Sequence, residues 1–221
     1  MTTPSTSVPD SLRERKKART RAALIAVSQR RFVEVGYTAT TLEEICAEVA
    51  VRPQTLLRYF DSKAHLAMAP WTDRLVVLGD QLSETRRSSA IEVWRAFVVA
   101  ESQEAVSPTS AVTGDLISAL RAFNAWADRD PVLVAMNSDL ERRYQTVLAA
   151  ALAADRGLEP EDLHSTLITA MLVVGRRAVF ERWLARGGRS ASLVDDQLAV
   201  IDYAVRSLPR RSAQRLLTID A

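Results

Sequence analysis

The sequence predicts an all-α protein in which three short N-terminal helices form a helix-turn-helix and a larger helical domain follows. The 221 residues are rich in Ala, Leu, Val and Arg, and they include only 7 glycines and 8 prolines. Most of these residue types carry little penalty in a helix, and few helix breakers interrupt them. Apolar residues recur at helical spacing, the breaks between segments are short, and no segment alternates as a strand does.

The N-terminal helices have recognisable start and stop residues. Ser11 is a plausible N-cap for the first helix, and Gly36 suits the turn after its end. Thr41 with Glu44 three residues later predicts the start of a second helix over about 42–49. Pro53, which is tolerated in a first helical turn, predicts a third helix over about 53–60.

The rest of the chain continues the helical pattern. Asp61 and Ser62 suit the cap of a fourth helix over about 63–86, with a kink or break at Pro70. Further helices are expected over about 90–106, 110–129, 131–155, 160–186 and 190–206. We therefore expect a disordered tail over 1–10, a helix-turn-helix domain over 11–62, a helical ligand-binding and dimerisation domain over 63–208, and a loose tail over 209–221.

Charge and composition narrow the function. Residues 1–65 carry a net charge of +4 and the remainder −2, an asymmetry typical of a nucleic-acid binder with a separate second domain. The single cysteine, Cys46, excludes an intrachain disulfide. Only two histidines are present, and no metal-ligand, phosphate-loop or nucleophile motif is found, so we expect neither an enzyme, a metal nor a cofactor. No run approaches about 18 uncharged apolar residues, so a cytoplasmic protein without a membrane partner is expected.

A set of residues between positions 18 and 66 follows a recognisable order and spacing. The set comprises Thr20, Ala22, Ala23, Phe32, 36–45, Ala47, 50–63 and Leu66. In these residues the sequence resembles the TetR family of bacterial transcription regulators. The resemblance covers under a quarter of the chain, and beyond it the chain is similar only in length, helical character and break points.

The third helix is the expected reader of DNA. If its N-terminus enters the major groove, its first turn offers Arg52, Gln54 and Thr55. Arginine can bond guanine in two places, glutamine can pair with adenine, and threonine can contact a thymine methyl group or a phosphate. Leu57 departs from the aromatic residue common in the family, which leaves a backbone contact there open; it could instead pack against the first helix. The remaining candidate contacts are Arg58 to a base or phosphate, Tyr59 and Lys63 where the family contacts phosphates, Thr41 at a helix N-terminus, and Arg19 in the basic run of the first helix.

The resemblance also implies a homodimer on double-stranded operator DNA, and a small lipophilic or aromatic effector. The expected interface lies on the last two long helices, and the expected pocket lies among aromatic residues of the second domain. Repression and activation remain alternatives, as does a helical ligand-binding or protein-interaction module without operator binding. Interface candidates are Leu167, Met171, Val179, Trp183, Leu198, Ile201 and Val205; pocket candidates are Trp71, Trp94, Phe97, Phe123, Trp126, Met136, Tyr144 and Met171.

Overall fold

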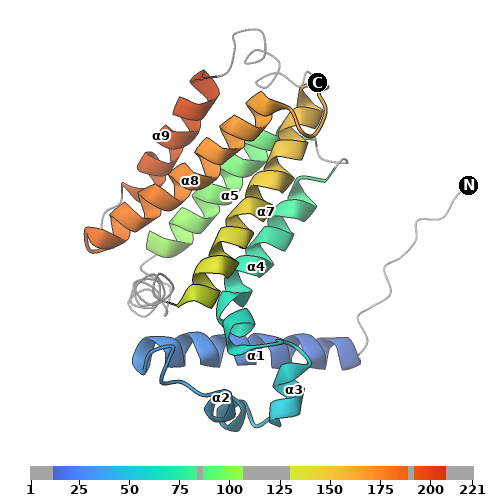
Figure 1. Cartoon of the computed structure of the whole chain (residues 1–221), viewed down its shortest axis with the longest axis vertical. Coiled ribbons are helices and arrows are strands. Elements are labelled where there is room, and N and C mark those ends of the chain that lie inside the picture. The colour runs from blue at the N-terminus through green and yellow to red at the C-terminus, as the bar shows by residue number, and fades with distance from the viewer. Residues whose placement is uncertain (1–11, 84–86, 107–129, 189–191, 208–221) are drawn as a thin grey trace, which may run out of the picture. The chain divides into compact units, whose positions relative to one another are not determined.

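The computed structural model describes residues 12–83, 87–106, 130–188 and 192–207, and every regular element within these ranges is an α-helix (Figure 1). The chain divides into two compact units between Ala69 and Pro70. Helix α4 (Lys63–Gln81) begins in the first unit and ends in the second.

The first unit contains α1 (Leu12–Glu34), α2 (Leu42–Val49), α3 (Pro53–Leu57) and the start of α4. Helix α2 packs against both α1 and α3. Each helix contributes at least one apolar side chain to a common core, and removing such side chains from water is the main stabilising contribution. The fully buried members are Leu24, Phe32, Ile45, Leu56 and Leu66.

Local hydrogen bonds set the ends of α2 where the sequence predicts them. The Thr41 side chain accepts from the Glu44 backbone N–H at 3.2 Å, and the Glu44 carboxylate accepts from the Thr41 N–H at 2.9 Å, which completes a capping box. At the other end Ala50 has φ 57°, a left-handed conformation, and the Val51 N–H donates to the Cys46 carbonyl at 2.9 Å. This turn leads directly into α3, so the helix-turn-helix arrangement is confirmed.

The second unit holds the remainder of α4 with α5 (Ala90–Val106), α7 (Pro131–Asp155), α8 (Leu163–Ala185) and α9 (Leu193–Arg206). Helix α8 packs between α7 and α9, while α5 contacts α7 and α9 (Figure 1). The predicted bounds of α5 and α7 are confirmed, because Asp130 accepts from the Val132 N–H at 2.9 Å and Pro131 occupies the first turn. The predicted helix over 110–129 and both predicted tails lie outside the described residues.

Several predicted boundaries were wrong. Helix α3 ends at Leu57 rather than residue 60, since the backbone N–H groups of Tyr59 and Phe60 turn back onto the Leu56 carbonyl. Helix α4 continues through Pro70 and ends at Gln81, five residues before the predicted end at 86. Helix α8 begins after Asp162, whose carboxylate accepts from the Ser165 N–H at 2.8 Å, so Pro160 lies outside its first turn. Helix α9 begins at Leu193 rather than at residue 190.

Helix α8 is long and apolar enough to cross a membrane by length and composition alone, although the sequence contains no run of about 18 uncharged apolar residues. Two features argue for a packed helix. Arg176 and Arg177 lie within it, and each pairs with a carboxylate on a neighbouring helix: Arg176 with Glu101 at 3.2 Å and Arg177 with Glu141 at 2.8 Å. A charged pair at mid-helix is costly in lipid.

Candidate nucleic-acid interface and effector unit

Helix α3 is anchored by one side chain and presents the others. Leu56 is fully buried, whereas Arg52, Gln54 and Arg58 are exposed and Thr55 is half-buried. Arg52 is the N-cap of α3, and its side chain makes no capping hydrogen bond. The first turn of α3 therefore offers an arginine and a glutamine, the side chains best suited to bidentate contacts with guanine and adenine.

The residues after Gln54 differ from their predicted placement. Arg58 is the C-cap of α3, and Tyr59 follows in the turn, half-buried with its ring centroid 6.4 Å from that of Phe60. Leu57 is 50% exposed, so it does not pack into the core against α1. An exposed leucine has no hydrogen-bond donor for a phosphate, and the surface at this point of α3 is apolar.

The basic surplus of the first unit is unevenly distributed. Arg30 and Arg31, near the end of α1, pair with carboxylates of α1 and α2: Arg30 with Glu34 and Glu48, and Arg31 with Glu44 at 3.0 Å and Glu48 at 3.5 Å. These ion pairs neutralise Glu44 and Glu48 of α2. The surplus charge therefore comes mainly from the N-terminal half of α1, where Arg19 and the lysines at 16 and 17 are exposed, and from Arg52 and Arg58 at the two ends of α3.

Two of the predicted phosphate contacts outside α3, Thr41 and Lys63, make internal bonds. Thr41 is exposed, and its side-chain oxygen takes part in the α2 capping box. Lys63 is half-buried, and its ammonium donates to the backbone carbonyls of Tyr37 and Thr40 at 2.9 and 3.0 Å. Its donors are thus directed at the preceding loop, an arrangement that the sequence pattern did not reveal.

In the second unit, four of the predicted pocket residues come together. The rings of Trp94, Phe97 and Tyr144 lie with centroids 5.8 to 6.5 Å apart, and the Tyr144 hydroxyl donates to the Trp71 carbonyl at 3.2 Å. Burial raises the pKa of Tyr144 to about 12, so its phenol remains a neutral hydrogen-bond donor. Met136 and Met171 are half-buried, while Phe123 and Trp126 lie outside the described residues.

The aromatic cluster contains charged residues that sequence reasoning missed. The Arg176 guanidinium lies 5.9 Å from the Trp94 ring centroid and 5.4 Å from that of Tyr144, within cation–π range. The Glu101 carboxylate forms two ion pairs, one with the Arg176 guanidinium at 3.2 Å and one with the Arg74 guanidinium at 3.1 Å. Nε1 of the fully buried Trp94 has no hydrogen-bond partner among the described residues. Glu101 follows Trp94 by seven residues, which places both on one face of α5. This spacing is the one feature of the sequence that could have predicted the cluster.

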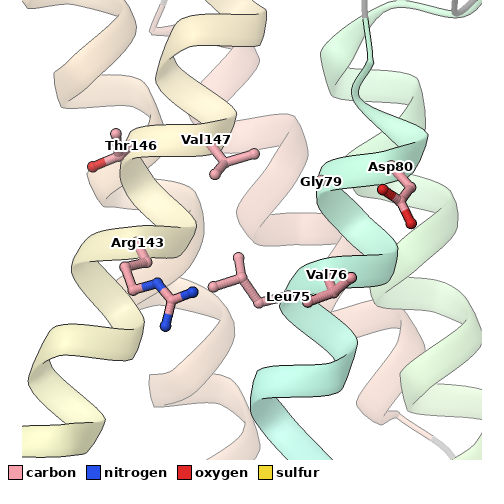
Figure 2. Close-up of a pocket in the computed structure, with 7 residues that line it drawn as sticks. All are labelled: Leu75, Val76, Gly79, Asp80, Arg143, Thr146 and Val147. Atoms are coloured by element: carbon pink, nitrogen blue, oxygen red, sulfur yellow. The ribbon is translucent and has the colours of Figure 1, made fainter.

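A groove of about 370 Å³ lies between α4 and α7 (Figure 2). Leu75 and Val147 point toward the space between the two helices, and the charged side chains of Asp80 and Arg143 also line the groove. None of the predicted pocket residues lines it. The remaining lining residues are Val76, Gly79 and Thr146.

Residues 24–69 match the family model described as bacterial regulatory proteins, tetR family. The matched segment contains α2, α3 and the buried residues that hold them, which are the elements that form the candidate interface. Residues 24–69 are therefore similar to the DNA-binding segment of the tetR family. The family model describes bacterial regulatory proteins, and this match supports a DNA-binding regulator.

One curated relative spans most of this chain. The HTH-type transcriptional regulator TcmR of Streptomyces glaucescens is 29% identical over 190 residues, which is 83% of each chain. Among solved structures, SmeT, a Stenotrophomonas maltophilia repressor solved with triclosan, has a TM-score of 0.62 at 18% identity, with 86% of this chain and 91% of SmeT covered. Bacillus subtilis FadR with stearoyl-CoA has a TM-score of 0.57 at 15% identity, covering 85% and 99%. These structures share the fold.

The predicted interface residues fall into two groups. Leu167 is 56% exposed on α8, while Met171, Val179, Leu198 and Val205 are half-buried. Trp183 and Ile201 are buried within the second unit at 3% and 1% exposure, so their side chains belong to its own core and are not available to a second copy. Residues that periodicity did not single out are exposed instead: Val174 on α8 and Tyr203 on α9.

Proposed function

We propose that this protein is a regulator of the TetR family and represses transcription by placing α3 in the major groove of an operator. The observation that carries the proposal is the surface of α3, where Arg52, Gln54 and Arg58 are exposed around the fully buried Leu56. Because Leu56 anchors the helix, the polar side chains are presented from a rigid element. Such a helix reads only a few base pairs, so specificity requires two copies on a near-palindromic site.

The second copy would pack against the apolar face of α8. Leu167 and Val174 follow Leu163 by four and eleven residues, a spacing that places all three on one side of the helix. Each of these side chains is more than half exposed. Exposed apolar side chains gathered on one face favour a partner of the same character. A homodimer through α8 and α9 would cover this face, with the exposed Tyr203 of α9 as a further contact.

The effector would be a small lipophilic or aromatic molecule held by the second unit. The aromatic cluster supplies apolar surface, and the Trp94 N–H with the neighbouring Arg176 supplies hydrogen-bond donors for an oxygen on the ligand. Leaving an indole N–H buried without an acceptor costs roughly 1–3 kcal/mol, so an acceptor brought by a ligand would be favoured. Among structures with the same fold, SmeT was solved with triclosan and FadR with stearoyl-CoA.

Release from DNA would follow from different affinities of the effector for two conformations. A ligand shifts the equilibrium only if it binds the conformation that does not fit the operator more tightly. Helix α4 contributes to both units, so a change in its second half would be felt at its first turn. The operator as partner would place the protein in the cytoplasm.

Fluorescence anisotropy with labelled duplexes tests the proposal. Purified protein is titrated against the intergenic DNA beside its own gene and against a random duplex, at several salt concentrations. Binding to the intergenic duplex at least about 10³-fold tighter than to random DNA is the expected result for an operator-binding regulator. No binding to either duplex at low salt would overturn the proposal.

A further inference from the structure

The ammonium of Lys63 lies inside a cage of backbone carbonyls. Nζ donates to the carbonyl oxygens of Tyr37 at 2.9 Å, Thr40 at 3.0 Å and Thr38 at 3.4 Å, the last at the long end of hydrogen-bond range. It also lies 4.5 Å from the centroid of the Tyr37 ring. An ammonium carries three N–H donors, and this cage provides three acceptors. All contacts are within the first unit.

The loop over residues 37–40, whose carbonyls form the cage, also packs against α1. The Tyr37 ring is buried and packs edge-on against Phe32 of α1, with centroids 5.3 Å apart. The buried Thr40 hydroxyl donates to the Gly36 carbonyl at 2.8 Å. The segment is therefore held between α1 and the Lys63 ammonium, and the next residue, Thr41, is the N-cap of α2.

We propose that Lys63 is a positioning residue for DNA binding, one that acts through the loop over residues 37–40 and not by contacting a phosphate. The ammonium holds the carbonyls of this loop on one side. In a trans peptide the following N–H points the opposite way, so the N–H groups of Thr38 and Ala39 are directed away from Lys63. The same loop sets where α2 starts, and α2 packs against α3.

Electrostatics explains why lysine suits this position. Three converging carbonyl dipoles surround a compact point charge, whereas a planar guanidinium presents its donors in a rigid fork. An arginine would serve a phosphate equally well or better, but it would not reproduce the cage. The two roles therefore make opposite predictions for Lys63→Arg. The positioning role rests on the proposed DNA-binding function, although the cage itself is testable without DNA.

Lysine footprinting of the wild-type protein is the first test, because the lysines of this chain are Lys16, Lys17 and Lys63 only. The full-length protein is treated with an acetylating succinimidyl ester, alone and with a short random duplex at low salt, and each lysine is quantified by peptide mass spectrometry. Caged Lys63 should react about tenfold more slowly than exposed Lys16 and Lys17 in the free protein, with little further change on DNA. Equal reactivity of all three lysines in the free protein, with protection of Lys63 only on DNA, would overturn the proposal.

Two substitutions complete the test, with Lys17→Met as the matched control on α1. Lys63→Met should speed amide hydrogen exchange over residues 38–45 without DNA. It should weaken binding to the intergenic duplex about tenfold while leaving the salt slope unchanged, and Lys63→Arg should not restore affinity. The salt slope is the change in the logarithm of the binding constant with the logarithm of the salt concentration. If its magnitude falls by about 1 in Lys63→Met and is restored in Lys63→Arg, Lys63 contacts a phosphate. If the wild type bound no DNA, footprinting and exchange would still decide whether the cage exists.

Discussion

Helix α8 passes α9 so closely at Gly175 that a Cβ atom there would lie 2.5 Å from Cγ1 of Val200. This separation is far inside ordinary van der Waals contact, and Val200 is a β-branched residue with little rotamer freedom in a helix. Gly175 therefore sets the approach of the two helices that carry the candidate dimer face.

Gly175→Ala should destabilise the protein although alanine is the better helix former. The gain in helix propensity is about 1 kcal/mol, and overpacking costs typically 1–3 kcal/mol, so a net loss near 1 kcal/mol is expected. Urea unfolding of the full chain measures it. Gly79→Ala is the matched control, because nothing lies within 4 Å of a Cβ at Gly79, and it should stabilise by about 1 kcal/mol. Equal effects of the two substitutions would contradict the close approach.

Leu167→Glu should convert a dimer into a folded monomer. The side chain is largely exposed in one copy, so a charge there costs little until a second copy buries it. Light scattering gives the mass and circular dichroism the helix content. Val132→Glu, on an equally exposed valine of α7, should remain dimeric. Ile201→Glu should instead lose stability by several kcal/mol, since its side chain is buried within the second unit.

Gln54→Ala and Arg52→Ala should each weaken binding to the operator by roughly 1–3 kcal/mol and leave random DNA almost unchanged. The reason is that exposed side chains in the first turn of α3 read base edges, not phosphates. Anisotropy titrations against both duplexes measure the ratio of affinities. Variants whose ratio equals that of the parent protein would remove these residues from the reading surface.

Leu57→Tyr should tighten binding to all DNA by about 0.5–1 kcal/mol. Leu57 is half exposed and lacks a donor, whereas a tyrosine hydroxyl at this position could donate to a phosphate. Leu57→Phe separates the hydroxyl from the ring. If Phe and Tyr have the same effect, the gain comes from apolar contact and not from a phosphate hydrogen bond.

The capping box of α2 should make stability depend on acid pH. The Thr41 backbone N–H, and then the Arg31 guanidinium, bond to the Glu44 carboxylate and lower its pKa from the ordinary value of 4.5. A folded-state pKa below the unfolded one means that this stability is complete above pH 4.5 and is lost as the pH falls through the lowered pKa. Urea unfolding from pH 7 to pH 3 should show a steeper loss for the wild type than for Glu44→Gln. Glu43→Gln, which leaves the capping box intact, should keep the wild-type slope.

Capping signals and prolines explain which elements the sequence predicted well. Thr41 with Glu44 marks the start of α2, and Asp130 with Pro131 marks the start of α7, because a cap bonds to backbone groups only two or three residues away. The end of α3 was predicted three residues too late. The N–H groups of Tyr59 and Phe60 both donate to the Leu56 carbonyl, and no residue pattern in the sequence marks such a turn.

The sequence by itself determined the helical class, the helix-turn-helix and the side chains that α3 carries, because periodicity, caps and motif spacing are local properties of the chain. Only the tertiary structure decided which partner each side chain meets. It directed the Lys63 ammonium to carbonyls 23 to 26 residues earlier in the chain and brought Arg176 beside Trp94 and Tyr144. It also buried Ile201 and Trp183 within their own unit. A helix that is apolar on several faces shows that its side chains will be covered, but only packing between distant segments decides by what.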